Sequence, residues 1–250
     1  MSNTLRANTT VGQTTRMSLS TQLYIGAVIA AGALVLGTFA PRELSQPLLA
    51  LTFLAAMIVV SLFKLRLPLG DGQSTMSMAY VVDFAVIATA GADLAMVIAA
   101  VGTLVQCTVN VRKRQPWYRT AFSVATVVLA VRTAGLTFAA FGGTSDGPMG
   151  LAAVLPLVAA AVPYFAINTG LVAAAIALSS GVSPVRCWTQ HFLSTAPSFF
   201  AAAAVVAGIE IAMTRDAYLL LASAALPMAL CHLAYAAWFR KLEPRTPATA

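Results

Sequence analysis

The stretch GLAAVLPLVAAAVPYFAINTGLVAAAIALS, residues 150–179, decides the fold class of this chain. It has no charged side chain and is longer than the about 20 apolar residues that a helix needs to cross a bilayer. It also contains Pro156 and Pro163, which disfavour a straight helix. We therefore expect a membrane segment here. It is either one kinked, tilted helix or an interfacial piece followed by a span.

Similar apolar stretches recur on both sides of this segment. The chain is 59% hydrophobic and 9% charged, whereas an ordinary soluble domain is about 25% charged. A soluble core could not absorb this much apolar surface without exposing large patches. We predict an all-α, polytopic integral membrane helical bundle with about eight transmembrane helices. The expected spans are residues 22–40, 47–63, 76–91, 94–111, 117–141, 150–179, 193–213 and 217–239.

Two short polar segments flank the predicted transmembrane domain of residues 22–239. Residues 1–21 are rich in Thr and Ser, so we expect a disordered cytoplasmic tail there. Residues 240–250 are expected to form a cytoplasmic C-terminal tail. The first apolar run, Leu23 to Ala40, exceeds a usual signal-peptide core, and no A-x-A cleavage site follows it. It is therefore expected to remain as a membrane anchor.

The charge distribution predicts an orientation. The formal net charge is +7, and most basic residues fall in alternate loops between the expected spans. With a cytoplasmic N-terminus, the inner regions contain Arg6, Arg16, Lys64, Arg66, Arg112, Lys113, Arg114, Arg119, Arg186, Arg240, Lys241 and Arg245. Only Arg42 and Arg215 fall outside, each beside an acidic residue. This asymmetry follows the positive-inside rule and predicts a bacterial cytoplasmic (inner) membrane protein with both termini in the cytoplasm.

The basic run Arg112-Lys113-Arg114, followed by Trp117 and Tyr118, resembles a small nucleic-acid-binding patch. In a chain this apolar, a cytoplasmic loop with an aromatic anchor at the membrane interface is the better interpretation. The basic side chains are then expected to meet anionic lipid headgroups. The lipid bilayer is therefore an expected partner, and nucleic acid is not.

Two charged residues, Arg132 and Glu210, fall inside expected spans, where an ionisable group is costly without a partner. Each lies toward the outer end of its span at a similar depth, so we predict that they pair. A structural ion pair that fixes helix packing is the favoured interpretation. A ligand-sensing or ion-handling role is an alternative, and in a third possibility Arg132 snorkels or faces a partner subunit.

A second polar set, Asp83, Asn168 and His232, is expected in the inner half of the bundle. We interpret it as a hydrogen-bonded cluster that locks the helices together. His232 is a weak candidate for binding a haem or a chlorophyll-type pigment, and the cofactor is otherwise unknown. No second His or Cys has ligand spacing with it, so no metal site is predicted. The cysteines form no C-x-x-C pair and are interpreted as buried small hydrophobes; they are Cys107, Cys187 and Cys231.

Three regions of the chain resemble one bacterial family. They are SLFKLRLP (61–68) with STMS (74–77), RKRQPWYRTAF (112–122), and YFAINTGLVAAAIALSSGVSPVRCWTQHFLSTAPSF (164–199). They resemble the membrane-embedded, sensor-type N-terminal module of signalling proteins with HD-GYP or GGDEF output domains. Those output domains hydrolyse or make cyclic di-GMP. No HD pair, GGDEF motif or coiled-coil linker follows the last expected span, so the enzymatic output is not expected here.

Two functions follow as hypotheses. The first is a non-enzymatic membrane module that acts as a subunit or accessory of a larger protein assembly. Alanine-rich surfaces such as Ala201 to Ala204 allow the close helix contacts that a partner helix would use. The alternative is a small-molecule-sensing or substrate-binding membrane receptor with an unknown ligand. It predicts a cavity lined by at least three of Asp83, Arg132, Asn168, Glu210 and His232. No catalytic residue is predicted, because the sequence shows no nucleophile–base pair.

Overall fold

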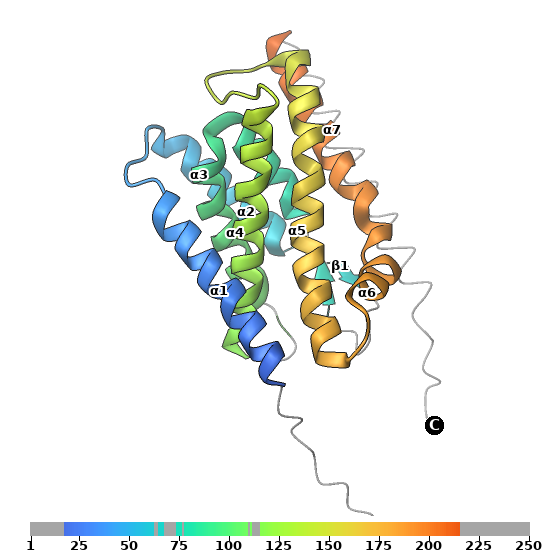
Figure 1. Cartoon of the computed structure of the whole chain (residues 1–250). Helices are drawn as coiled ribbons and strands as arrows, with labels where there is room; N and C mark the ends of the chain where they lie inside the picture. Colours follow the sequence, from blue (N-terminus) through green and yellow to red (C-terminus); the bar gives the residue numbers. More distant parts are fainter. Residues whose placement is uncertain are drawn as a thin grey trace, which may run out of the picture.

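The computed structural model of the chain describes residues 18–62, 65–67, 74–76, 78–109, 111 and 116–215. These residues form a helical bundle with one very short strand pair (Figure 1). Within them, five helical segments are long and apolar enough to cross a membrane. They are Leu19–Phe39, Ala79–Thr108, Trp117–Ala140, Gly150–Ser180 and Pro184–Thr214. The protein is thus a multi-pass helical membrane protein, as the sequence predicts.

The bundle consists of helices joined by short connections. In chain order they are α1 (Leu19–Phe39), α2 (Pro47–Leu62), β1 (Leu65–Leu67), β2 (Ser74–Met76), α3 (Ala79–Thr108), α4 (Trp117–Ala140), the 3-10 turn η1 (Gly150–Ala153), α5 (Val154–Ser180), α6 (Pro184–His191), the 3-10 turn η2 (Leu193–Thr195) and α7 (Ala196–Thr214). The strands pair antiparallel, with Leu65 opposite Met76 and Leu67 opposite Ser74. This small ladder was not predicted, because the sequence analysis assigned helices only.

The first helix begins earlier than predicted. The Ser18 hydroxyl accepts a hydrogen bond from the Thr21 backbone N–H (3.2 Å), which satisfies one of the free amides at the helix start. The Thr21 hydroxyl is buried and donates to the Leu178 carbonyl of α5 (3.1 Å). Residues 19–21 therefore belong to α1 and not to a tail. The rest of the expected N-terminal tail, residues 1–17, lies outside the described residues.

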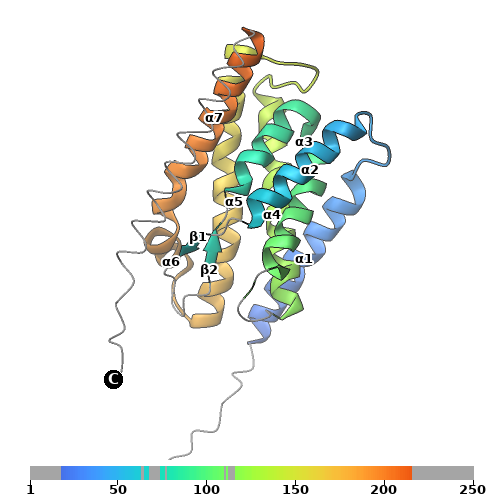
Figure 2. The ribbon, with the colours of Figure 1, turned by 180° about the vertical axis from the view of Figure 1, so that it is seen from behind.

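The longest helix among the described residues, α3, is bent into two arms. Gly91 has φ +84° and ψ 167°, which interrupts the helix. The first arm places Tyr80 against Phe199 at the start of α7, with ring centroids 4.5 Å apart. The second arm packs against α2, since a Cβ on Gly102 would collide with Met57. The two arms follow the two expected spans 76–91 and 94–111; Figure 2 shows α3 from behind.

Helix α4 forms the centre of the bundle. It packs against α1, α3 and α5, while α5 also contacts α7 and α6 (Figure 1). Small residues allow this closeness: a Cβ on Gly32 of α1 would lie 2.5 Å from the Ala125 Cβ of α4. In α5, Pro163 sits inside one continuous helix that follows η1. Of the two possibilities for residues 150–179, the structure therefore has the single helix.

The predicted count of eight spans is only partly reproduced. α1, α4, α5 and α7 match expected spans, and two others match the arms of α3. α2 is apolar but shorter than the five spanning segments. The eighth expected span, 217–239, and the expected tail 240–250 lie outside the described residues. The number eight therefore stays a prediction.

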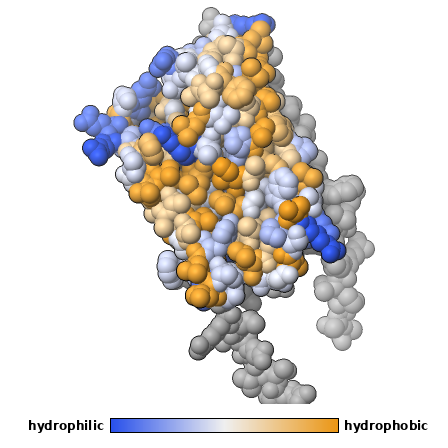
Figure 3. Space-filling model, viewed as in Figure 1, coloured by the Kyte–Doolittle hydropathy of each residue, from blue (hydrophilic) through white to orange (hydrophobic). Residues whose placement is uncertain are grey.

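The surface has the distribution that a bilayer requires. Apolar residues cover the middle of the face in Figure 3, and hydrophilic residues gather toward its two ends. α1 contributes strongly to this apolar surface, since Leu19, Leu23 and Leu34 are each more than 60% exposed. These side chains have no protein neighbours to bury them, and lipid is the solvent that suits them.

Candidate functional site: the polar contacts inside the bundle

Asp83 and Tyr164 form the most deeply buried polar contact. The Tyr164 hydroxyl, on α5, donates to Asp83 Oδ2 on the first arm of α3 over 2.6 Å. The two residues are 1% and 2% exposed. Asp83 Oδ1 has no hydrogen-bond partner among the described residues. Because a buried polar atom is expensive to leave unpaired, the contact fixes the register between α3 and α5.

Aromatic rings surround this contact. Phe84 lies 5.2 Å and Phe199 lies 5.6 Å from the Tyr164 ring, measured between centroids. Phe199 also stacks on Tyr80 and meets Phe165 edge-on at 5.3 Å. Offset and edge-to-face pairs at these separations are favourable. The Asp83 carboxyl thus lies in a buried aromatic layer that joins α3, α5 and α7.

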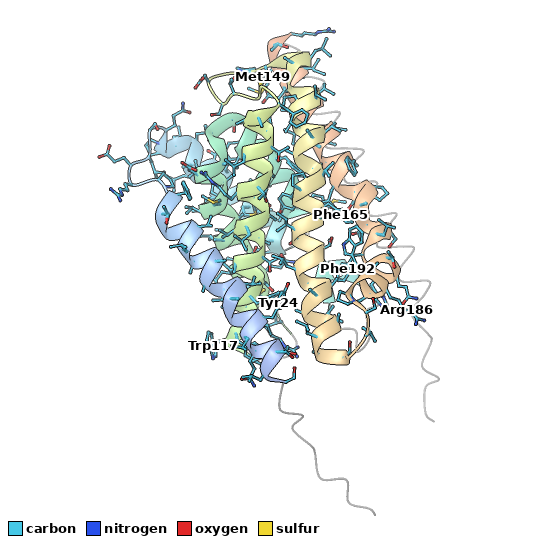
Figure 4. The ribbon with its side chains drawn as sticks, viewed as in Figure 1. Tyr24, Trp117, Met149, Phe165, Arg186 and Phe192 are labelled. Carbon is cyan, nitrogen blue, oxygen red and sulfur yellow. The ribbon has the colours of Figure 1, made fainter. Side chains whose placement is uncertain are left out.

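A neighbouring contact anchors the short helix α6. The Trp188 indole N–H donates to the Thr169 hydroxyl (2.8 Å), which in turn donates to the Phe165 carbonyl (2.6 Å). The Trp188 and Phe165 rings are 5.6 Å apart. Figure 4 shows Phe165 and Phe192 on the side of the bundle where α5 meets α6. Cys187 is buried against Ala173 and Phe192, which agrees with its interpretation as a small hydrophobe.

Arg132 pairs with Asp93, not with Glu210 as the sequence analysis predicted. Arg132 Nη1 contacts Asp93 Oδ1, and the guanidinium lies over the Phe39 ring, 3.8 Å from its centroid. The side chains of Arg132 and Asp93 are 19% and 53% exposed, so the pair lies at the rim of the bundle. The prediction failed because the bend at Gly91 turns Asp93 back toward α4, while α5 separates α4 from α7.

Glu210 bonds to a backbone amide instead of to Arg132. It is 2% exposed, and its Oε2 accepts a hydrogen bond from the Met149 backbone N–H over 2.9 Å. Met149 precedes η1, where the chain turns tightly enough that a Cβ on Gly150 would lie 2.9 Å from the Thr214 hydroxyl. Glu210 therefore ties α7 to the start of the η1–α5 segment, at the end of the bundle where Figure 4 labels Met149.

Of the inner cluster predicted from Asp83, Asn168 and His232, the structure describes Asp83 and Asn168. Asp83 bonds to Tyr164, one helical turn before Asn168 on α5. Asn168, on α5, is half-buried. His232 lies outside the described part of the chain. Sequence reasoning missed Tyr164, Thr169 and Trp188, whose only signal is a hydroxyl or indole within an apolar segment.

The described residues also form an apolar groove, which we call the α1–α4 groove. Its volume is about 850 Å³, and α1, the second arm of α3 and α4 line it. Its lining includes Ala33, Leu36, Leu104, Trp117 and Val124. None of Asp83, Arg132, Asn168 or Glu210 belongs to it. Among the described residues, no group of three His, Cys, Asp or Glu side chains is placed to hold a metal ion.

Comparisons with known proteins add no relative: no family model, no curated protein and no solved structure matches this chain.

Proposed function

We propose that this chain is a non-enzymatic membrane module that works as a subunit or accessory of a larger membrane assembly. One observation carries the proposal: the three charged candidates in the described bundle are engaged in contacts that join its own helices. These contacts are Asp83 with Tyr164, Arg132 with Asp93, and Glu210 with the Met149 amide. Because these charged side chains join helices of the bundle to one another, we infer that the module acts through its outer surface.

A strip of small residues on α1 supports this proposal. Gly26, Ala30 and Gly37 are exposed and recur on the side of α1 turned away from the bundle. A Cβ added to Gly26 or Gly37 would meet nothing within 4 Å. Small residues at helical spacing let two transmembrane helices approach closely, which is how helices associate in lipid. We call these three residues the α1 strip and propose that it contacts a partner helix.

The receptor alternative has less support. It needs a cavity lined by at least three of the intramembrane polar residues, and the α1–α4 groove contains none of the four that the structure describes. The resemblance to sensor-type modules of HD-GYP and GGDEF proteins favours a regulatory partner.

The α1 strip gives the experiment. We would compare Ala30→Leu with Ala31→Leu, a matched control because both alanines are exposed neighbours on α1 and only Ala30 lies on the strip. Co-purification from native membranes in mild detergent is the measurement. Loss of a co-purifying protein in Ala30→Leu alone is expected. The proposal fails if the unmodified chain brings down no protein, or if both variants retain their partner equally.

A further inference from the structure

Asp83 lies deep in the bundle, near the middle of the membrane. Its partner Tyr164 lies ten residues after Val154, the first residue of α5, which at 1.5 Å per residue is about 15 Å. This depth is about half of the roughly 30 Å hydrocarbon core of a bilayer. Figure 4 labels Phe165, the residue after Tyr164, near the middle of α5. A charge at this depth is costly unless an opposite charge pairs with it.

The described part of the chain places no cation against Asp83. Arg132 pairs with Asp93 at the rim of the bundle, and Asp83 has no ion pair with a described Lys, Arg or His. The other basic residue of α4, Arg119, lies in the first turn of that helix. Helix α2, which packs on α3, has no ionisable side chain. An Asp83 carboxylate would therefore lack a counter-ion among the described residues.

The ionisable groups around Asp83 are tyrosines. Tyr164 is the one ionisable residue of α5, and its hydroxyl donates to Asp83 Oδ2. Tyr80 lies one turn earlier on α3 and stacks on Phe199 of α7. The one ionisable residue of α7 is Glu210, which accepts a hydrogen bond from a backbone amide outside this layer. Asp83 is thus in contact with aromatic groups that are neutral at neutral pH.

The two carboxyl oxygens of Asp83 have different surroundings. Oδ2 accepts the hydrogen bond from Tyr164, and Oδ1 has no partner among the described residues. An ionised carboxylate would be a buried full charge with one hydrogen bond. A protonated carboxyl leaves only a neutral O–H unpaired, which costs far less than an unpaired buried ion. The packed bundle therefore favours a carboxyl group that keeps a proton on Oδ1.

We propose that Asp83 is a proton-binding site inside the membrane and that its proton holds the first arm of α3 against α5. When the proton leaves, the carboxyl O–H bond breaks, both electrons stay on Oδ1, and a water molecule takes the proton. The new charge favours hydration and so drives the first arm of α3 out of the aromatic layer. Proton binding thus controls the packing of the module, which goes beyond its role as an accessory subunit.

Infrared spectroscopy of the full chain in detergent tests the proton directly, because a protonated carboxyl and a carboxylate have separate stretching bands. At neutral pH the unmodified chain should show the C=O band of a protonated carboxyl, and Asp83→Asn should lose it. Asp93→Asn is the matched control, since it removes a carboxyl from the same helix at a side chain that is 53% exposed. This control should keep the band.

Tyr164→Phe keeps the carboxyl and removes its hydrogen bond. The band should remain and move to higher frequency, because the C=O bond no longer accepts a hydrogen bond. Tyr118→Phe, at the start of α4, should leave the band unchanged. This pair decides the question even if Asp83→Asn does not fold. A band that keeps its frequency in Tyr164→Phe belongs to another carboxyl group and overturns the proposal.

Thermal unfolding tests the coupling to packing. We would measure it from about pH 5, above the ordinary range of aspartate, to about pH 9, below that of tyrosine. A folded chain that holds one proton more than the unfolded chain loses stability as the pH rises. Its folding equilibrium should weaken about tenfold per pH unit while the folded chain keeps the proton.

Asp83→Asn has no proton to release at this position, so its stability should lack that part of the pH dependence. Equal pH dependence in the unmodified chain and in Asp83→Asn would overturn the proposal. So would an unmodified chain that shows, at neutral pH, no protonated-carboxyl band that Asp83→Asn removes.

Discussion

At the residue scale, the Tyr164 hydroxyl stabilises the fold through its hydrogen bond to Asp83. Tyr164→Phe should lower the stability of the detergent-solubilised protein by about 1–3 kcal/mol, because Asp83 loses its only described hydrogen bond while still buried. Thermal unfolding measures the change. Tyr118→Phe, at the start of α4, is the control and should be nearly neutral.

The matching double variant separates hydrogen bonding from packing. Adding Asp83→Leu to Tyr164→Phe should recover part of the loss, since replacing both polar partners by apolar groups removes the unpaired oxygen. If the double variant is instead clearly less stable than Tyr164→Phe alone, Asp83 has a stabilising role besides its hydrogen bond to Tyr164.

The Arg132 contact gives a second prediction at this scale. A double-mutant cycle of Arg132→Leu and Asp93→Leu should show a coupling of about 0.5–1 kcal/mol, the usual value for a pair at the rim. The same cycle with Glu210→Leu in place of Asp93→Leu should show none, because Glu210 bonds to the Met149 amide. If Arg132 is coupled to Glu210 and not to Asp93, the pairing predicted from the sequence is correct and the contact with Asp93 is not.

At the element scale, the bend in α3 depends on one glycine. Gly91→Ala should cost about 1–2 kcal/mol, because an L side chain is disfavoured at φ +84°. An added Cβ would lie 3.6 Å from the Ser145 hydroxyl, so the cost is conformational and not steric. Gly208→Ala, in open space within α7, should instead be neutral or stabilising. Equal thermal midpoints for the two variants would argue against the bend.

The elements show where sequence reasoning succeeds. Hydrophobic length located α1, α4, α5, α7 and both arms of α3, because lipid exposure imposes an apolar run on each. It failed for partners, since depth along a straight span says nothing about which face a residue occupies. Asp93 falls between the expected spans 76–91 and 94–111, but it lies on the second arm of α3, where Arg132 contacts it. Glu210 accepts a hydrogen bond from a backbone amide, and the pattern of side chains in a sequence does not predict such a partner.

At the scale of the whole molecule, the two ends of the bundle differ in charge. Arg119 and Arg186 lie at the end where α1 begins, and the 141–149 loop with Asp146 lies at the other (Figure 4). The positive-inside rule therefore predicts that the end of the bundle where α1 begins is cytoplasmic. In a background without the native cysteines, Asp146→Cys should react with a membrane-impermeant maleimide in intact cells. Ser183→Cys should react only after permeabilisation, and the reverse pattern would invert the topology.

The central claim is that the interior of this bundle is used for packing and that its function lies in what it touches. The most direct measurement is the mass and composition of the particle released from native membranes by mild detergent. We predict a particle larger than one chain that contains a second, reproducible protein. A monodisperse single chain, with lipid and detergent as its only companions, would contradict the claim.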